Sequence, residues 1–106
     1  MGHYLFHGSY TQAGIQGVLK EGGTGRMKAV EAVVASGGGR IESFYWALGT
    51  DDYYQIAELP DNTAAASISA TIGATGSVSI STVVLLTADE IDAAVARHPS
   101  YRAPGA

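Results

Sequence analysis

The sequence of 106 residues predicts an α+β domain, in which strands and crossover helices follow one another in the order βαββαβ and one further helix comes last. Three observations predict this class. Four runs alternate with the period of two that is typical of strands. Two stretches between them carry apolar residues three and four positions apart, as helices do. Glycine, proline, threonine and aspartate stand at the boundaries, where turns and helix caps need them.

The first strand is expected at His3–Ser9 and is followed by a helical region. One face of the strand carries Tyr4, Phe6 and Gly8, and the other carries His3, Leu5, His7 and Ser9. Thr11 is the expected N-cap, and Tyr10 has hydrophobic-staple spacing to Ile15. An apolar stripe of Ile15, Val18 and Leu19 is then interrupted by Gly22, Gly23 and Gly25. We therefore expect the helical region in two pieces, with Thr24 able to cap the second.

A hairpin is expected in the middle of the chain. Gly37–Gly39 stop the helix, because glycine adopts the left-handed conformation of a C-terminal cap without strain. The second strand is predicted at Arg40–Leu48 and the third at Asp52–Leu59, joined by a tight turn. In the third strand, one face carries Tyr54 and Ile56, and the other carries Tyr53, Gln55 and Ala57.

The last third of the chain contains two helices and a strand. Pro60 ends the third strand, and Asp61 is a suitable cap for a helix with Ala65, Ile68 and Ile72 on one side. The fourth strand is predicted at Ser77–Leu86. Thr87–Glu90 is a capping box for a helix that runs to about Arg97. We assign residues 1–97 to one domain and residues 98–106 to an extended tail.

This element order is the split βαβ pattern of ferredoxin-like folds. Right-handed crossovers place their helices on the same side of the sheet, so the three helices are expected to cover one face. The open face is then semi-polar and aromatic, carrying His3, Leu5, His7, Ser9, Ser43, Tyr45, Gln55, Ser79 and Ser81. Such a face is either a ligand platform or the interface of a two-fold dimer. We expect a homodimer that encloses a chamber between two sheets, a dimeric α/β barrel.

Composition excludes several classes of function. The formal net charge is -4 and no basic cluster occurs, which argues against nucleic acid as a partner. The absence of cysteine removes disulfides and sulfur-based metal sites. No signal-like N-terminus or long apolar segment is present, so we expect a cytoplasmic protein without a membrane partner. Common nucleotide-binding and hydrolase motifs are absent, and no cofactor is expected.

The candidate site residues come from the predicted open face and its hairpin. His7 is a possible acid-base group, because imidazole titrates near neutral pH, and Tyr45 and Gln55 are placed to orient a carbonyl or enol substrate. Tyr45 and Asp52 are further catalytic candidates, and the expected ligand-binding residues are His7, Tyr45, Tyr53 and Gln55. The structural alternative for His7 is a hydrogen-bonded interface residue, and for Asp52 a turn carboxylate that accepts backbone N–H groups.

No metal site is predicted. His3 and His7 share a face but stand roughly 13 Å apart along a strand, which is too far for one ion, and no carboxylate is clearly placed to help. The glycine-rich segment Gly22–Arg26 has the composition of an anion-binding loop, but it does not follow a strand and lacks the phosphate-loop spacing. Loop flexibility is the simpler interpretation.

Several segments together resemble the GYD domain family. They are Y-L-F-H-G-S-Y-T-x-x-G-I at 4–15, I-E-S-F-Y-W-A-L-G-x-x-D at 41–52, L-P-D at 59–61 and L-L-T-x-x-E at 85–90. The likeness covers about residues 4–95. It implies a small bacterial or archaeal protein with the fold of dimeric α/β-barrel proteins and no assigned activity. Only the combination of motifs is specific, because each motif alone is structural.

Two positions depart from the family's pattern. In the stretch Gly49–Asp52, Asp51 stands where the family often has a tyrosine, so only Gly49 and Asp52 correspond. His7 stands where an apolar residue or glutamine is expected. We therefore keep three hypotheses: a small-molecule-binding or structural homodimer, a cofactor-independent isomerase or monooxygenase that uses His7, and an assembly module that forms larger oligomers.

Overall fold

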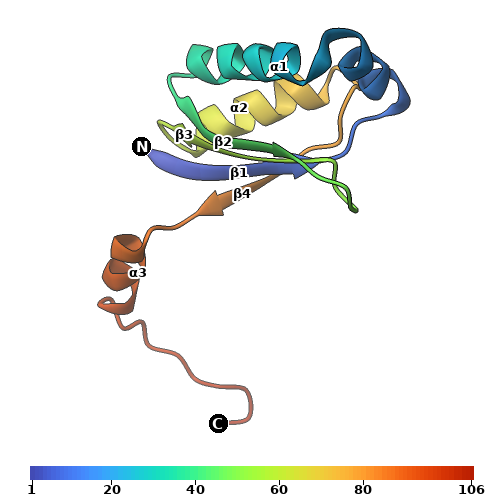
Figure 1. Cartoon of the computed structure of the whole chain (residues 1–106). Coiled ribbons are helices and arrows are strands. Elements are labelled where there is room, and N and C mark those ends of the chain that lie inside the picture. Colours follow the sequence, from blue (N-terminus) through green and yellow to red (C-terminus); the bar gives the residue numbers. More distant parts are fainter.

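A computed structural model describes residues 1–106 and confirms the α+β class. Four antiparallel strands form one sheet in the order β2-β3-β1-β4 (Figure 1). The elements are β1 (Gly2–Gly8), α1 (Gln12–Ser36), β2 (Arg40–Trp46), β3 (Tyr53–Leu59), α2 (Asn62–Gly73), β4 (Ser81–Leu85) and α3 (Ala88–Val95). The element order and strand order agree with a ferredoxin-like arrangement. None of the helices combines the length and apolar character that a membrane crossing needs.

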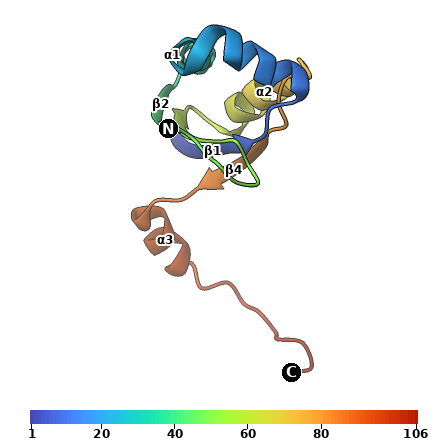
Figure 2. The ribbon, with the colours of Figure 1, turned by 45° about the vertical axis from the view of Figure 1, so that its right-hand side comes forward.

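Only two of the three helices cover the sheet. α1 and α2 lie on the same face, and the core between helices and sheet contains Tyr4, Phe6, Val30, Val34, Ala57, Leu59, Ala65 and Ile68 (Figure 1). The expectation that α3 shields this face as well was wrong. Figure 2 shows α3 and the tail projecting away from the rest of the chain, and none of the α3 residues is buried. The chain accordingly extends over 57 Å.

α1 consists of two pieces, as the glycines predicted. Thr11 caps its start by accepting a hydrogen bond from Gly14 N, and Gly22 interrupts it with φ 77° and ψ 171°. The apolar stripe of the first piece is not its buried side, because Ile15 is 40% and Leu19 80% exposed. Gly14 is the buried residue there instead. The helix backbone approaches the Ser77 carbonyl so closely that a Cβ at Gly14 would overlap it.

β3 turns the opposite face inward from the one predicted. Tyr53, Gln55, Ala57 and Leu59 are buried against the helices, whereas Tyr54, Ile56 and Glu58 face the open side. The prediction compared the apolar content of the two faces of this strand and placed Gln55 on the open face. Glu58 shares their face, however, and an ionised carboxylate is more costly to bury than a neutral amide. Gln55 is therefore inside, 6% exposed.

The helix caps agree with the prediction, but the fourth strand is shorter. Asp61 accepts from Ala64 N at 2.8 Å, and Thr87 and Glu90 form the capping box. β4 begins at Ser81 rather than at residue 77. The residues before it are held by one bridge between Tyr10 and Val78 and by a bond from Ser79 N to Ser9 O at 2.7 Å.

The close approach of α1 to Ser77 gives a prediction about stability. The Gly14→Ala variant should lower the free energy of unfolding by about 1–3 kcal/mol, because the backbone must shift to accept the methyl group. Gly17→Ala is the matched control, since a Cβ there meets no atom within 4 Å, and it should raise stability by about 0.5–1 kcal/mol through helix propensity. Urea denaturation measures both values. Equal effects of the two variants would contradict the packing of α1.

Candidate functional site

The open face of the sheet is organised in three rows that run across the strands. The middle row holds Ser43, Ile56, Leu5 and Val83, of which the last three are apolar. The row toward the β2–β3 hairpin holds Tyr45, Tyr54, His7 and Ser81, and the row at the other end holds Arg40, Glu58, His3 and Leu85. Tyr45 is 71%, Tyr54 42% and Val83 40% exposed. This face is semi-polar and aromatic as predicted, although Gln55 does not belong to it.

His7 is held by the hairpin and by its neighbour on β3. Its Nδ1 lies 2.5 Å from Asp51 Oδ2, and both side chains are about a quarter exposed. The Tyr54 ring stacks on the imidazole with 5.8 Å between ring centroids and an interplanar angle of 11°. β1 supplies the histidine, and the turn after β2 supplies the carboxylate. Two segments that are distant in sequence therefore fix one imidazole ring.

This arrangement suits acid-base chemistry. A carboxylate on Nδ1 holds the ring in one orientation and places the proton of the neutral form on that nitrogen. Nε2 is then an acceptor on the open face, which is the state required of a general base. Asp51 was not predicted to be a site residue, and from the sequence it was noted only as an expected departure from the family pattern. The available signal was that Asp51 and Asp52 are adjacent, so their side chains point to opposite sides, and a carboxylate on each side of the hairpin could have been expected.

The other catalytic candidates lie apart from this pair. Asp52 Oδ2 accepts from Tyr10 N at 3.0 Å, which agrees with the structural interpretation of Asp52 as a turn carboxylate. Tyr45 pairs with Tyr54 and is thus one strand further from His7. The predicted set of His7, Tyr45, Tyr53 and Gln55 is divided between the two faces of the sheet. His7 and Tyr45 lie on the open face, while Tyr53 and Gln55 lie beneath the helices.

His3 does have carboxylate neighbours, contrary to the sequence analysis. Its Nδ1 lies 2.7 Å from Glu42 Oε1 and its Nε2 3.9 Å from Glu58 Oε1. A bulge in the β2–β3 pairing between Ile41 and Ser43 turns Glu42 toward this end of the face. His3, Glu42 and Glu58 each offer one potential metal-ligand atom, and these three atoms lie within 4.8 Å of one another. Arg40 Nε, however, already pairs with Glu58 Oε2 at 2.7 Å. The geometry is that of an ion-pair cluster at the end of the sheet.

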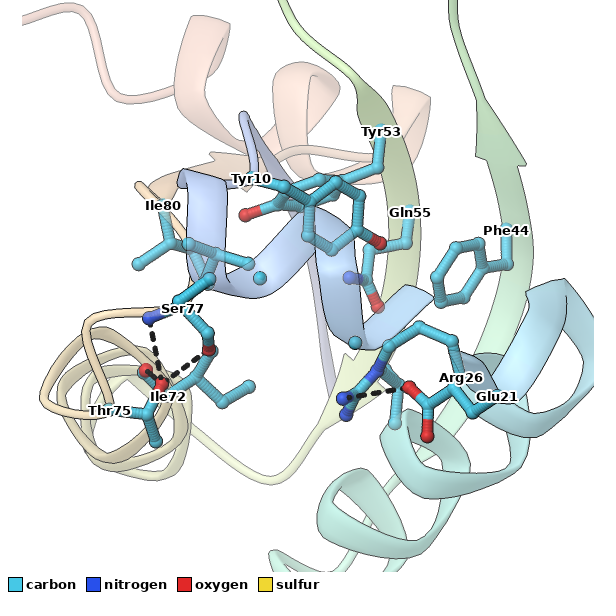
Figure 3. A pocket seen from close by; sticks show the side chains of 15 residues that line it. Tyr10, Glu21, Arg26, Phe44, Tyr53, Gln55, Ile72, Thr75, Ser77 and Ile80 are labelled. Carbon is cyan, nitrogen blue, oxygen red and sulfur yellow. Dashed lines mark hydrogen bonds and ion pairs between the residues drawn. The ribbon is translucent and has the colours of Figure 1, made fainter. Parts of the chain in front are cut away.

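The helix-covered face contains a cavity of about 220 Å³ between α1, the sheet and the segment after α2 (Figure 3). Small residues Ala13, Gly14 and Gly17 line it on the α1 side. Its other lining residues are Tyr10, Glu21, Arg26, Val30, Phe44, Tyr53, Gln55, Ile72, Thr75, Ser77, Val78 and Ile80. Arg26 pairs with Glu21 across the break in α1 at 3.3 Å. The Gln55 amide points into the cavity in Figure 3.

Two tyrosines close the end of this cavity near the hairpin. Tyr53 donates to Ser79 O at 2.8 Å, and Trp46 Nε1 donates to Tyr10 OH at 3.2 Å. The two tyrosine rings lie 5.6 Å apart. Burial raises the pKa of Tyr53 to about 12 and also raises the pKa of Tyr10. Both hydroxyls therefore remain protonated at neutral pH and act as hydrogen-bonding groups.

These features define a class of protein: a small ferredoxin-like α+β domain with one open sheet face and one covered cavity. The chain belongs to the GYD domain family, whose model matches residues 4–95. No curated protein and no solved structure matches the chain.

The raised pKa of Tyr53 predicts a loss of stability at high pH. An unfolded tyrosine has a pKa near 10, so between pH 10 and about 12 unfolding releases a proton from this residue. Its contribution is complete below pH 10 and is lost as the pH rises toward 12. Urea denaturation on either side of pH 10 should therefore show a smaller decline for Tyr53→Phe than for the wild type. Tyr54→Phe, on the open face, is the control and should keep the wild-type decline.

The contact between His7 and Asp51 predicts an unusual tautomer. In the neutral form, His7 should carry its proton on Nδ1, and Asp51→Ala should return it to Nε2, the form that free imidazole favours. Nitrogen chemical shifts in NMR spectra distinguish the two forms. His98, in the exposed tail, is the internal reference and should not change. The same His7 tautomer in both proteins would show that Asp51 does not control the ring.

Proposed function

We propose that this protein is a homodimer in which two open sheet faces meet and bind a small molecule beside His7. The observation that carries the proposal is the apolar run of Leu5, Ile56 and Val83 in the middle row, none of which is fully buried in its own chain. In a two-fold interface, a patch near the axis meets its own copy, so an apolar row is self-complementary. The tyrosine row and His7 then line the space between the sheets.

The C-terminal arm adds to the proposed interface. Four strands of at most seven residues give a sheet face of at most roughly 19 by 23 Å, about 440 Å², whereas a stable interface needs about 800 Å² from each partner. Leu86, Ile91, Val95 and Tyr101 are between 46% and 79% exposed in and around α3. None of these residues is buried in its own chain. We infer that the arm packs on the partner subunit and supplies the missing area.

A second candidate function is acid-base catalysis in the same chamber. The specific observation is the pair of His7 and Asp51, with the ring oriented and Nε2 unoccupied on the open face. This supports an isomerase- or monooxygenase-type reaction without a cofactor. The His7→Ala variant distinguishes the two functions: a catalytic His7 loses turnover while the dimer persists, and an interface His7 loses association.

A single substitution that introduces a charge into the open face tests whether the protein associates through this face. Val83→Glu places a carboxylate in the middle row and should convert the dimer to monomer, because desolvating an unpaired charge is costly. Sedimentation velocity should show a dissociation constant at least tenfold larger than that of the wild type. Leu19→Glu is the matched control, since Leu19 is 80% exposed on α1, away from this face. It should leave the dimer intact.

Native mass spectrometry of freshly purified protein completes the test, because it counts subunits and detects a retained small molecule together. A dimer with added mass supports the proposal. A wild-type protein that stays monomeric in dilute solution would overturn the chamber and the role given to His7 within it.

A further inference from the structure

The cavity beneath α1 exists because this end of the sheet is covered by helix backbone and not by large side chains. The buried core uses Val30 and Val34 from the second piece of α1. The first piece presents Ala13, Gly14 and Gly17 to the cavity, and its bulkier Leu19 points to solvent. About 220 Å³ is therefore left unfilled next to the end of the core. A cavity of about 150 Å³ with apolar walls is large enough for benzene.

One wall of this cavity carries an unpaired polar group. Gln55 is 94% buried (6% exposed), and its Oε1 has no hydrogen-bond partner in the chain. Figure 3 shows its amide among the rings of Tyr10, Tyr53 and Phe44. A buried acceptor without a partner is destabilising, so a native protein normally satisfies it. The neighbouring hydroxyl of Tyr53 does not, because it donates to Ser79 O.

The geometry points to a binding site for a single-ring aromatic molecule that carries one hydroxyl or N–H donor. The amide turns Gln55 Oε1, which has almost no accessible surface without a ligand, toward this donor, and the ring fills the space between Phe44, Val30 and Ile80. Rings of Tyr10 and Tyr53 face the same space and suit an aromatic ligand through edge or offset stacking. This site is separate from the proposed chamber, because β3 carries Gln55 on its covered face and Tyr54 on its open face.

The test compares phenol with toluene, which has nearly the same shape but no donor. In NMR titrations of the wild-type protein, phenol should shift the methyl resonances of Val30, Ile72 and Ile80 in a saturable way. It should bind at least tenfold more tightly than toluene, since only phenol satisfies the amide oxygen. Gln55→Met has a similar volume without the polar group. In this variant the order should reverse, with toluene binding more tightly than phenol.

Two controls separate this site from the open face. Val83→Glu should bind phenol like the wild type even as a monomer, and His7→Ala should do the same, because both residues lie on the other side of the sheet. The inference is overturned if neither ring perturbs these methyl groups, if the wild type binds toluene as tightly as phenol, or if Gln55→Met keeps the preference for phenol. The wild-type comparison alone decides the matter if Gln55→Met does not fold.

Discussion

The pairing of Leu5 with Ile56 determines on which side of the sheet each functional side chain lies. Opposite residues of antiparallel strands share a face, so a slip of one residue would move every β3 side chain to the other side. The observed register puts Glu58 outside and Gln55 inside. The alternative register would bury a carboxylate, which costs more than burying an amide. This register therefore places both the unpaired Gln55 amide in the cavity and the tyrosine row on the open face.

The cavity also depends on the break in α1. Before Gly22, the helix lies so close to the Ser77 carbonyl that a larger residue does not fit at position 14. After the break, the helix presents Val30 and Val34 to the core. A single unbroken helix would carry one continuous buried stripe along its length. The break therefore allows one helix to pack closely at one end and to leave room beside Gln55.

Much of the fold was predictable because caps, glycines and alternation are local signals. Thr11, Asp61 and the Thr87–Glu90 box cap helices as predicted. Local signals failed where two faces have similar apolar content. In β3, Gln55 and Glu58 lie on opposite faces, and only their relative burial costs decide between them. The cap signals of α3 predicted the helix itself but not that it leaves the sheet, where none of its residues is buried. The Asp51–His7 contact joins segments 44 residues apart, and no spacing rule reveals such a pair.

His7 and Asp51, the two positions at which the sequence was expected to differ from the family's pattern, are neighbours in space. The hairpin itself is held by other groups: Asp52 accepts from Tyr10 N, Asp52 N donates to Gly8 O, and Ser9 Oγ donates to Thr50 O. Asp51 is therefore not needed to form the turn. Asp51 instead supplies an acceptor that fixes the ring of His7. The two side chains therefore form one hydrogen-bonded unit beside the open face.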